Sequence, residues 1–328
     1  MKKEGKYYTT QDNLISCNLC PHNCKLNEGQ HGICGIREAS EGSLYTLNYG
    51  EISSIGLDPI EKKPLFHFKP GKIVLSVGSF GCNFSCSFCQ NYSISKNLPK
   101  TQYVAPEALI DEAGSRISDG NVGIAFTYNE PSIWYEYVYD VAQLCSDKNL
   151  DMILVTNGYI NLEPLKDLLP YISAMNIDLK AFNNHYYRTV CGGDVDSVLN
   201  TISTADSKCH VEITTLLVNG YNDSDEEVKG LSKKLSEINK SMPLHLSRYY
   251  PTYKMDAPAT PIDRVISCRD VAKKYLQYVY VGNIANVENN TYCHKCNNLL
   301  IERTAYDVNV YIKEPICPKC SEKINIIL

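Results

Sequence analysis

The feature of this 328-residue sequence that most restricts its fold is an alternation of β-branched or apolar runs with helical patterns, which starts near residue 72. The runs with the composition of strands are residues 72–77, 121–128, 151–157, 173–180, 210–218, 244–250 and 277–283. Helical patterns lie between them, and repeated βα units of this kind predict a parallel sheet. Six or seven units suit a full or partial barrel better than a doubly wound sheet, so we predict an α/β fold with a partial (β/α)6-type barrel.

Cysteine-rich segments flank the predicted barrel on both sides. We predict three parts: an N-terminal cysteine-rich module over residues 1–70, the barrel over residues 71–285, and a C-terminal module resembling a zinc ribbon over residues 286–328. Neither flanking segment is long enough to form a strong hydrophobic core of its own. A bound metal is therefore a physically reasonable source of stability in both.

Composition disfavours several classes of protein. A net charge of −5 with 21% charged residues suits an ordinary folded chain, and it disfavours a nucleic-acid partner without excluding one. No run approaches the ~20 apolar residues that cross a bilayer, and the first residues lack the apolar core of a secretory signal. We therefore predict a cytoplasmic protein with no membrane partner.

The chain has 15 cysteines, which is a large number for a reducing compartment, where disulfides are rare. Most of them fall into three clusters with the spacing of metal ligands. These clusters are Cys17, Cys20, Cys24 and Cys34; Cys82, Cys86 and Cys89; and Cys293, Cys296, Cys317 and Cys320. The sequence therefore predicts a metalloprotein.

The central cluster, CxxxCxxC at Cys82, Cys86 and Cys89, follows the first predicted strand. Three thiolates are one fewer than a closed tetrahedral zinc site or a fully ligated [4Fe–4S] cluster requires. A [4Fe–4S] cluster held by three thiolates from one loop leaves its fourth iron open to a small molecule. The alternatives are a partial zinc knuckle with a distant fourth ligand, or three unrelated buried cysteines.

This stretch, GCNFSCSFCQN, has Phe88 directly before its last cysteine and resembles the cluster-binding loop of the radical S-adenosylmethionine (radical SAM) superfamily. The resemblance covers about residues 72–285. It implies that the amino and carboxylate groups of S-adenosylmethionine (SAM) bind the open iron. It also implies that one electron from the reduced cluster cleaves the S–C5′ bond, which gives methionine and a 5′-deoxyadenosyl radical that abstracts hydrogen from a substrate.

Later strand ends carry polar residues that the resemblance assigns to SAM. The second strand ends in TYNEP, where the family has Gly-Gly-Glu, so Tyr128 and Asn129 replace the glycines and Glu130 keeps the acid that pairs with the SAM amino group. VTNG and NIDLK resemble strand-end motifs of glycyl-radical-enzyme activases. The further SAM contacts that the resemblance implies are Phe88, Thr156, Asn157, Asp178, Lys180, Arg248 and Gly282. A structural ion pair or hydrogen bond at the barrel mouth is the alternative for the polar side chains.

The flanking cysteine sets differ in spacing. The C-terminal set is two CxxC pairs separated by twenty residues, which favours a zinc ribbon over an auxiliary [4Fe–4S] cluster. Two short predicted strands, LLIERTAY and VNVYIK, lie between these pairs. The N-terminal set has two, three and nine residues between its cysteines, a spacing that slightly favours zinc over an auxiliary cluster. His22 offers an imidazole that could replace one of its thiols.

Segments along nearly the whole chain, among them CPHNCKL, LDPIEKKPLFHF, NIDLKAF, YYRTVCGG and NTYCHKC, resemble the AmmeMemoRadiSam-system radical SAM enzymes, relatives of pyruvate formate-lyase activating enzyme. This resemblance implies companion proteins of the AMMECR and Memo types. It also implies a low-potential electron donor, a flavodoxin or a ferredoxin. Cys191, in the YYRTVCGG loop, is a candidate catalytic residue, and a buried structural cysteine is the alternative.

Three functions remain open from the sequence. The first is a radical SAM enzyme that abstracts hydrogen from an unidentified substrate. The second is an activase that installs a glycyl radical on a partner enzyme. The third belongs to another class, a zinc-binding module that docks RNA or protein without SAM chemistry.

Overall fold

The computed structural model describes residues 2–304 and 306–328, so residue 1 of the predicted N-terminal module and residue 305 of the predicted C-terminal module lie outside the described residues. Its centre is an eight-stranded sheet in the order β16-β15-β14-β13-β12-β11-β9-β8. The parallel strands are β9 (Ile73–Gly78), β11 (Asn121–Phe126), β12 (Asp151–Thr156), β13 (Ala174–Asp178), β14 (His210–Leu217), β15 (Leu244–Arg248) and β16 (Val279–Gly282). The seven predicted strands form in sequence order, which confirms the α/β barrel prediction.

Helices connect successive parallel strands, as expected for βα units. They are α2 (Pro106–Ser115), α3 (Tyr135–Asp147), α4 (Leu162–Leu168), α6 (Val195–Asp206), α7 (Asp225–Asn239) and α8 (Ile262–Ala272), with the short α1 (Tyr92–Ser95) and α5 (Asn184–Tyr186) in loops. The helix starts follow sequence signals: Pro106 is at the first position of α2, and the Ser224 hydroxyl accepts from the backbone N–H of Glu227 at 3.2 Å. Within the described ranges, no helix is long and apolar enough to span a bilayer.

One edge of the sheet is β8 (Ser54–Pro59), which pairs antiparallel with β9. This strand belongs to the predicted N-terminal module, so the predicted boundary near residue 70 does not coincide with an edge of the sheet. Gly56 and Pro59 interrupt the β-type composition of the strand, which is why the sequence did not mark it. A turn of 3-10 helix, Ile60–Lys62, begins the connection to β9.

The opposite edge is β16, which is covered by the C-terminal segment. The side chain of Asn289 accepts from the backbone N–H of Val281 at 3.1 Å and donates to the Val281 carbonyl at 2.8 Å, as a neighbouring strand would. The C-terminal strands β17 (Thr291–Tyr292), β18 (Leu299–Thr304) and β19 (Asp307–Val310) form a small antiparallel sheet. Its apolar residues pack with Tyr278 and Tyr280 in one buried cluster, so this segment packs against the β16 side of the barrel.

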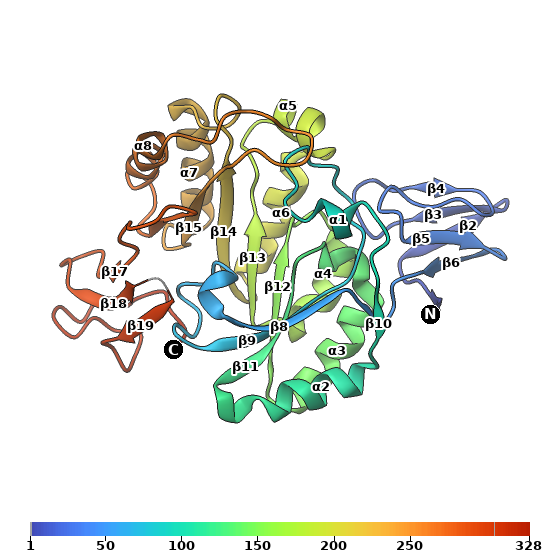
Figure 1. The fold of residues 1–328 in the computed structure, drawn as a ribbon, viewed down its shortest axis with the longest axis horizontal. Coiled ribbons are helices and arrows are strands. Elements are labelled where there is room, and N and C mark those ends of the chain that lie inside the picture. Colours follow the sequence, from blue (N-terminus) through green and yellow to red (C-terminus); the bar gives the residue numbers. More distant parts are fainter. Residues whose placement is uncertain (1, 305) are drawn as a thin grey trace.

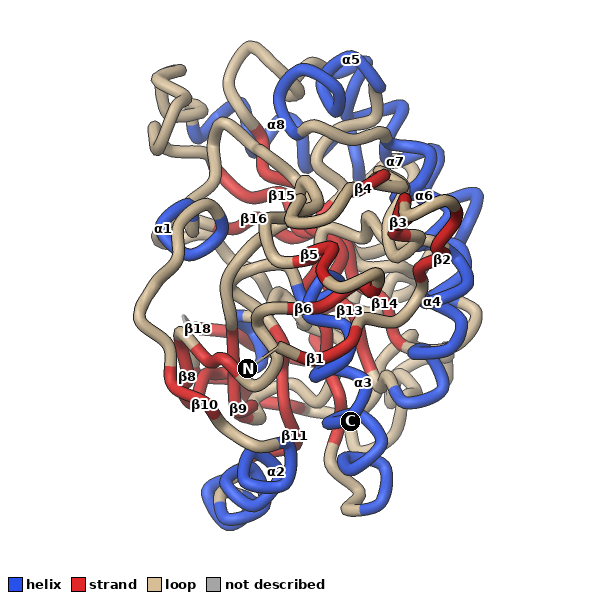
Figure 2. Tube along the Cα trace, turned by 90° about the vertical axis from the view of Figure 1, so that its right-hand side faces the viewer, coloured by secondary structure: helices blue, strands red, loops and turns tan. Residues whose placement is uncertain are grey.

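The N-terminal segment forms two small three-stranded sheets. Their strands are β1 (Lys3–Glu4), β5 (Arg37–Ser40) and β6 (Ser43–Thr46) in one, and β2 (Tyr8–Gln11), β3 (Leu14–Cys17) and β4 (Lys25–Leu26) in the other. A separate pairing joins β7 (Glu51–Ile52) to β10 (Gln102–Tyr103). The N-terminal strands lie to the right of the barrel in Figure 1 and nearest the viewer in Figure 2, whereas β17, β18 and β19 lie on the opposite side of Figure 1.

The N-terminal ends of the strands enclose a buried polar network built on Glu212, whose side chain is fully buried. Its carboxylate accepts from His245 Nε2 at 2.7 Å, His210 Nε2 at 3.0 Å and the backbone N–H of His67 at 2.7 Å. The ring of His67 is in turn fixed by the carbonyl of Asn325. Because buried charges require partners, this network fastens the segment before β9 and the end of the chain to the barrel floor.

Candidate active site at the mouth of the barrel

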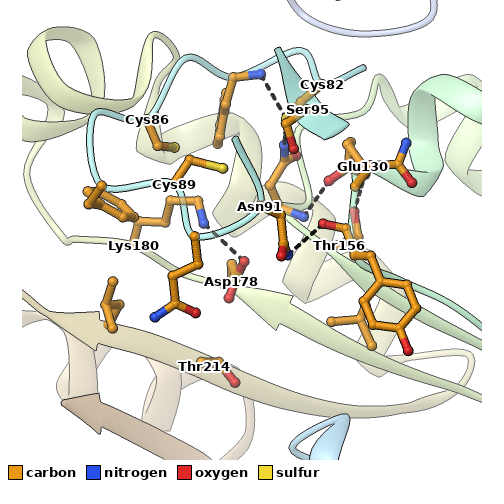
Figure 3. Close-up of a pocket in the computed structure, with 18 of the residues that line it drawn as sticks. Cys82, Cys86, Cys89, Asn91, Ser95, Glu130, Thr156, Asp178, Lys180 and Thr214 are labelled. Carbon is orange, nitrogen blue, oxygen red and sulfur yellow. Dashed lines mark hydrogen bonds and ion pairs between the residues drawn. The ribbon is translucent and has the colours of Figure 1, made fainter. Parts of the chain in front are cut away.

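A cavity of about 250 Å³ opens at the C-terminal ends of the parallel strands. Its lining includes residues that follow β9, β11, β12 and β13, residues of β14, and the ends of β15 and β16. These are Cys82, Phe84, Cys86, Phe88, Cys89, Gln90, Asn91, Ser95, Thr127, Tyr128, Asn129, Glu130, Val155, Thr156, Asn157, Asp178, Lys180, Thr214, Leu216, Ser247 and Asn283. The carboxyl ends of parallel strands converge on one face of a barrel, so residues distant in sequence meet here (Figure 3).

The three central cysteines reach the cavity from the loop after β9 (Figure 3). This loop is tightly fixed: the N–H of Gly81 donates to the Ile94 carbonyl at 3.0 Å, and Lys96 Nζ donates to the Phe84 carbonyl. Gly81 has a φ of 86°, and a Cβ there would lie 2.7 Å from Ile36 Cγ2, so both the conformation and the space favour glycine.

Burial sets the protonation state of these thiols. Burial raises the pKa of Cys82 and Cys89, and contact with Cys191 together with burial raises the pKa of Cys86 well above its usual range. The thiols are therefore neutral at physiological pH in the protein alone. A metal centre reverses that preference because its charge stabilises the thiolates, so three converging thiols fit a metal cluster.

Glu130 is buried beside the cysteines and joins the ends of β11 and β12. Its Oε1 accepts from the Thr156 hydroxyl at 2.6 Å and the Ser132 N–H at 2.9 Å, and its Oε2 accepts from the Asn157 N–H at 2.8 Å. Burial raises the pKa of Glu130. These three bonds use three of the roughly four acceptor positions that a carboxylate offers.

Tyr128 and Asn129 line the cavity, but their side-chain polar groups are used elsewhere. The Tyr128 hydroxyl donates to Asp58 at 2.9 Å, and the Asn129 amide oxygen accepts from the Ser79 N–H at 2.9 Å. Tyr128 has a φ of 71°, a left-handed conformation for which glycine is better suited. Its carbonyl accepts from Asn91 Nδ2 at 2.8 Å, so the backbone here faces the cavity.

Asp178 ends β13, Lys180 follows it, and the two form an ion pair at 2.9 Å (Figure 3). Lys180 Nζ lies 5.8 Å from the centre of the Phe88 ring, which is also on the cavity lining. Lys180 therefore brings a positive charge next to the cysteine loop.

Cys191 is fully buried behind the cysteine loop and does not line the cavity. It ends a π-helical turn, Tyr187–Cys191, and its carbonyl accepts from the Ser85 N–H at 2.7 Å. A Cβ on Gly192 would lie 2.7 Å from Ser85 Oγ, so the glycine after Cys191 permits this close approach. The structure thus gives Cys191 a packing environment, and its catalytic role stays a prediction.

Two predicted SAM contacts lie off the cavity lining. Arg248 donates from Nε to the Thr260 carbonyl at 2.7 Å and from Nη1 to the Tyr250 hydroxyl at 2.8 Å, while Gly282 lies beside Ser247. Ser247 and Asn283, next to these residues in sequence, line the cavity instead. Asn91, Ser95 and Thr214 also line it; Asn91 and Ser95 follow the cysteine motif, Thr214 lies within β14, and none of them was predicted from the sequence.

The flanking cysteine sets differ in geometry. In the C-terminal set the Cys293–Cys320 and Cys296–Cys317 sulfur pairs are both 3.6 Å apart, and all four sulfurs lie within 4.8 Å of one another. A tetrahedral zinc site with bonds of about 2.3 Å places its sulfurs about 3.8 Å apart. The C-terminal set can therefore hold one metal ion.

In the N-terminal segment, the His22 imidazole is a candidate replacement for a thiol ligand. Its Nε2 donates to the Asn83 carbonyl at 2.8 Å.

Comparison with known proteins agrees with this geometry. Residues 76–234 match the radical SAM superfamily, and an uncharacterized protein of Methanocaldococcus jannaschii is 39% identical over the full length of both chains. The chain belongs to the radical SAM superfamily. It is an enzyme of the radical SAM class, a family whose members use a [4Fe–4S] cluster and SAM. This membership excludes the third function considered from the sequence, a docking module without SAM chemistry.

Two further relatives place this radical SAM enzyme within the superfamily. A second M. jannaschii protein, named provisionally as a glycyl-radical enzyme activating enzyme, is 28% identical over 61% of this chain and 77% of its own. The radical SAM enzyme is thus homologous to glycyl-radical activating enzymes. Its fold also matches Streptococcus suis SuiB bound to S-adenosylmethionine, with a TM-score of 0.53 and 12% identity over 69% of this chain and 53% of that one.

Proposed function

We propose that Cys82, Cys86 and Cys89 hold a [4Fe–4S] cluster and that SAM occupies the cavity beside them. The observation that carries this proposal is the convergence of three thiols, a buried carboxylate and a lysine on one cavity in a radical SAM chain. When bound, the cluster and SAM supply a 5′-deoxyadenosyl radical by one-electron reduction of SAM. The protein abstracts hydrogen from its substrate with this radical.

The chain's own residues position SAM in this proposal. Glu130 has one free acceptor position for the SAM ammonium, and its other bonds hold Thr156 and Asn157 at the cavity. Lys180 pairs with the SAM carboxylate and is itself oriented by Asp178. The backbone at Tyr128 and Asn129 takes the place of the family's glycines, and Phe88 lines the cavity near Lys180.

Exposed aromatic residues around the mouth favour a polypeptide substrate. Tyr92 and Tyr253 are 40% and 37% exposed and stack with their ring centres 4.7 Å apart. Phe182, Tyr221 and Tyr250, which follow β13, β14 and β15, are also exposed. Aromatic residues of this kind are enriched in protein interfaces. Together with the homology to activating enzymes, they support the second candidate, an activase that installs a glycyl radical on a partner enzyme.

Several finer assignments complete the proposal. We place the chain in the AmmeMemoRadiSam group, with AMMECR-type and Memo-type companions, on the resemblance of its sequence motifs to that group. A full-length relative shares both flanking segments. A flavodoxin or a ferredoxin supplies the electron. The C-terminal set binds zinc, and the protein works in the cytoplasm.

The test is anaerobic reconstitution followed by addition of dithionite and SAM, with 5′-deoxyadenosine measured by chromatography. We expect its formation in the unmodified protein and its loss when Cys82, Cys86 and Cys89 are each changed to alanine. Cys209→Ala, which alters a cysteine outside the three sets, is the matched control and should retain the activity. An iron-loaded protein that forms no 5′-deoxyadenosine would refute the proposal.

A further inference from the structure

We infer that the four N-terminal cysteines hold a second [4Fe–4S] cluster, and that Asn83 connects it to the Cys82 loop. The four residues are Cys17, Cys20, Cys24 and Cys34. The inference rests on the proposed function in one respect, because it takes the Cys82 loop as the SAM-cluster site.

The four thiols surround a common space. A Cβ on Gly32 would lie 3.6 Å from Cys34 Sγ and 3.7 Å from Cys24 Sγ, so these sulfurs flank the same glycine. Cys17 interacts electrostatically with Cys34 and Cys24, and Cys20 interacts with Cys34 and Cys17. Cys24 and Cys34 therefore lie together at Gly32, and Cys17 and Cys20 are near enough to interact electrostatically with this pair or with each other.

The separation of these thiols suits a four-iron cluster better than a single metal ion. In the part of the chain that the structure describes, the C-terminal set is the only group of three or more Cys, His, Asp or Glu ligand atoms that all lie within 4.8 Å of one another. No three of the N-terminal thiols approach that closely, and neither do the three thiols of the Cys82 loop. The corners of a cubane hold thiolates farther apart than one zinc ion does. The N-terminal set therefore resembles the SAM-cluster loop and differs from the zinc-like set of the same chain.

A buried guanidinium provides a second, independent observation. Arg37 is 1% exposed and interacts electrostatically with Cys17 and Cys34. Its Nη2 bonds Glu136 and its Nη1 donates to the Lys6 carbonyl, but its Nε has no hydrogen-bond partner among the described residues. An unpartnered buried donor is costly, and an anionic cluster held by four thiolates would supply both an acceptor and a counter-charge.

Asn83 links this set to the SAM-cluster loop. It directly follows Cys82, its side chain interacts with the Cys20 thiol, and its carbonyl accepts from His22. Its Oδ1 also accepts from Asn157 Nδ2 at 2.9 Å, and that nitrogen lies 3.7 Å from Cys82 Sγ. A short path of covalent and hydrogen bonds therefore joins Cys20 to Cys82.

This path suits transfer of one electron. A low-potential carrier of the flavodoxin or ferredoxin class reduces the N-terminal cluster from 2+ to 1+. That cluster returns to 2+ as the cluster of the Cys82 loop is reduced from 2+ to 1+, and no proton moves and no covalent bond changes.

The experiment counts metals in anaerobically reconstituted full-length protein. We expect about eight iron atoms and one zinc per chain, from two four-iron clusters and the C-terminal set. The Cys82→Ala/Cys86→Ala/Cys89→Ala variant should keep about four irons, and Cys20→Ala/Cys24→Ala should lose about four. Cys209→Ala is the control and should keep all of them. The first variant leaves the N-terminal segment intact, so the test stands even if the second does not fold.

The outcomes separate the two proposals. Four irons and two zincs in the unmodified protein, with all iron lost from the Cys82 loop variant, would overturn the second cluster while leaving SAM cleavage intact. Four irons retained in that variant, with no 5′-deoxyadenosine from the unmodified protein, would support the second cluster and sink the proposed function. The connection is tested by electron paramagnetic resonance of the reduced protein. The spectrum of the reduced, unmodified protein should show two interacting spins. A spectrum equal to the sum of those of the Cys82 loop variant and the Cys20→Ala/Cys24→Ala variant would refute the proximity of the two clusters.

Discussion

The ion pair between Arg37 and Glu136 fixes the N-terminal segment to helix α3, and its burial makes the effect of breaking it large. Arg37 Nη2 lies 2.6 Å from Glu136 Oε1, and both side chains are 1% exposed. The Glu136→Gln change keeps the shape and one acceptor oxygen but removes the charge. Breaking a buried pair costs about 3–5 kcal/mol because the remaining charge has no compensation. Since glutamine still accepts a hydrogen bond, we expect a loss near the lower limit, about 3 kcal/mol, in the metal-free protein.

The assay is urea unfolding of the metal-free protein, followed by circular dichroism. Glu112→Gln is the matched control, because Glu112 pairs with Arg116 at 3.0 Å on the surface, with side chains 43% and 44% exposed. Exposed pairs contribute about 0–1 kcal/mol, so the control should hardly shift the midpoint. Equal shifts in the two variants would show that burial does not govern the Arg37 pair.

The same variant also reports on the N-terminal cysteines. An anionic cluster beside Cys17 and Cys34 supplies a second counter-charge to Arg37, so Glu136→Gln should destabilise the iron-loaded protein less than the metal-free protein. A loss of stability that is the same in both forms would refute the placement of an anion beside Arg37.

Three further predictions follow from particular contacts. Glu130→Gln should weaken equilibrium SAM binding about 10- to 100-fold, because it removes the charge that faces the ammonium; the exposed Glu163→Gln should not, and unchanged affinity in Glu130→Gln would contradict the assignment. Burial lowers the pKa of His67 from 6.5 to about 3, so the unfolded chain takes up a proton that the folded chain refuses. The stability contributed by this group is present above about pH 6.5 and falls by up to about 1.4 kcal/mol per pH unit toward pH 3. His67→Gln should therefore reduce the pH dependence of the urea unfolding midpoint between pH 7 and 5, and an unchanged pH dependence would refute this. Cys317→Ala/Cys320→Ala should remove one zinc and lower the thermal midpoint by several degrees without changing the iron content, and an unchanged zinc count would disprove the C-terminal site.

The sequence predicted the parts of the fold that follow from local patterns. The seven β-type runs formed parallel strands, and this topology alone brings Glu130, Thr156 and Lys180 to the mouth with the Cys82 loop. Glycine and proline in β8 concealed an edge strand whose existence depends on pairing with β9. Long-range pairing of this kind has no local sequence signal.

Side-chain direction at the site was less predictable than position. Arg248 occupies a strand end, as expected, but the Thr260 carbonyl and Tyr250 hydroxyl turn it away from the cavity, and its neighbour Ser247 lines the wall instead. Cys191 was marked by its motif, yet the glycine that follows it allows its turn to pack behind the cysteine loop. These outcomes depend on partners that lie far along the chain.

The Asn289 side chain on β16 has a consequence for solubility. An uncovered edge strand offers free N–H and carbonyl groups to any other strand, and pairing between chains is a common route to aggregation. The Asn289 side chain bonds both the N–H and the carbonyl of Val281, so it blocks pairing of another strand at this point of the edge. Asn289 belongs to the C-terminal segment. If the proposed C-terminal site holds a metal, its removal should loosen this segment and expose the β16 edge to pairing with another chain.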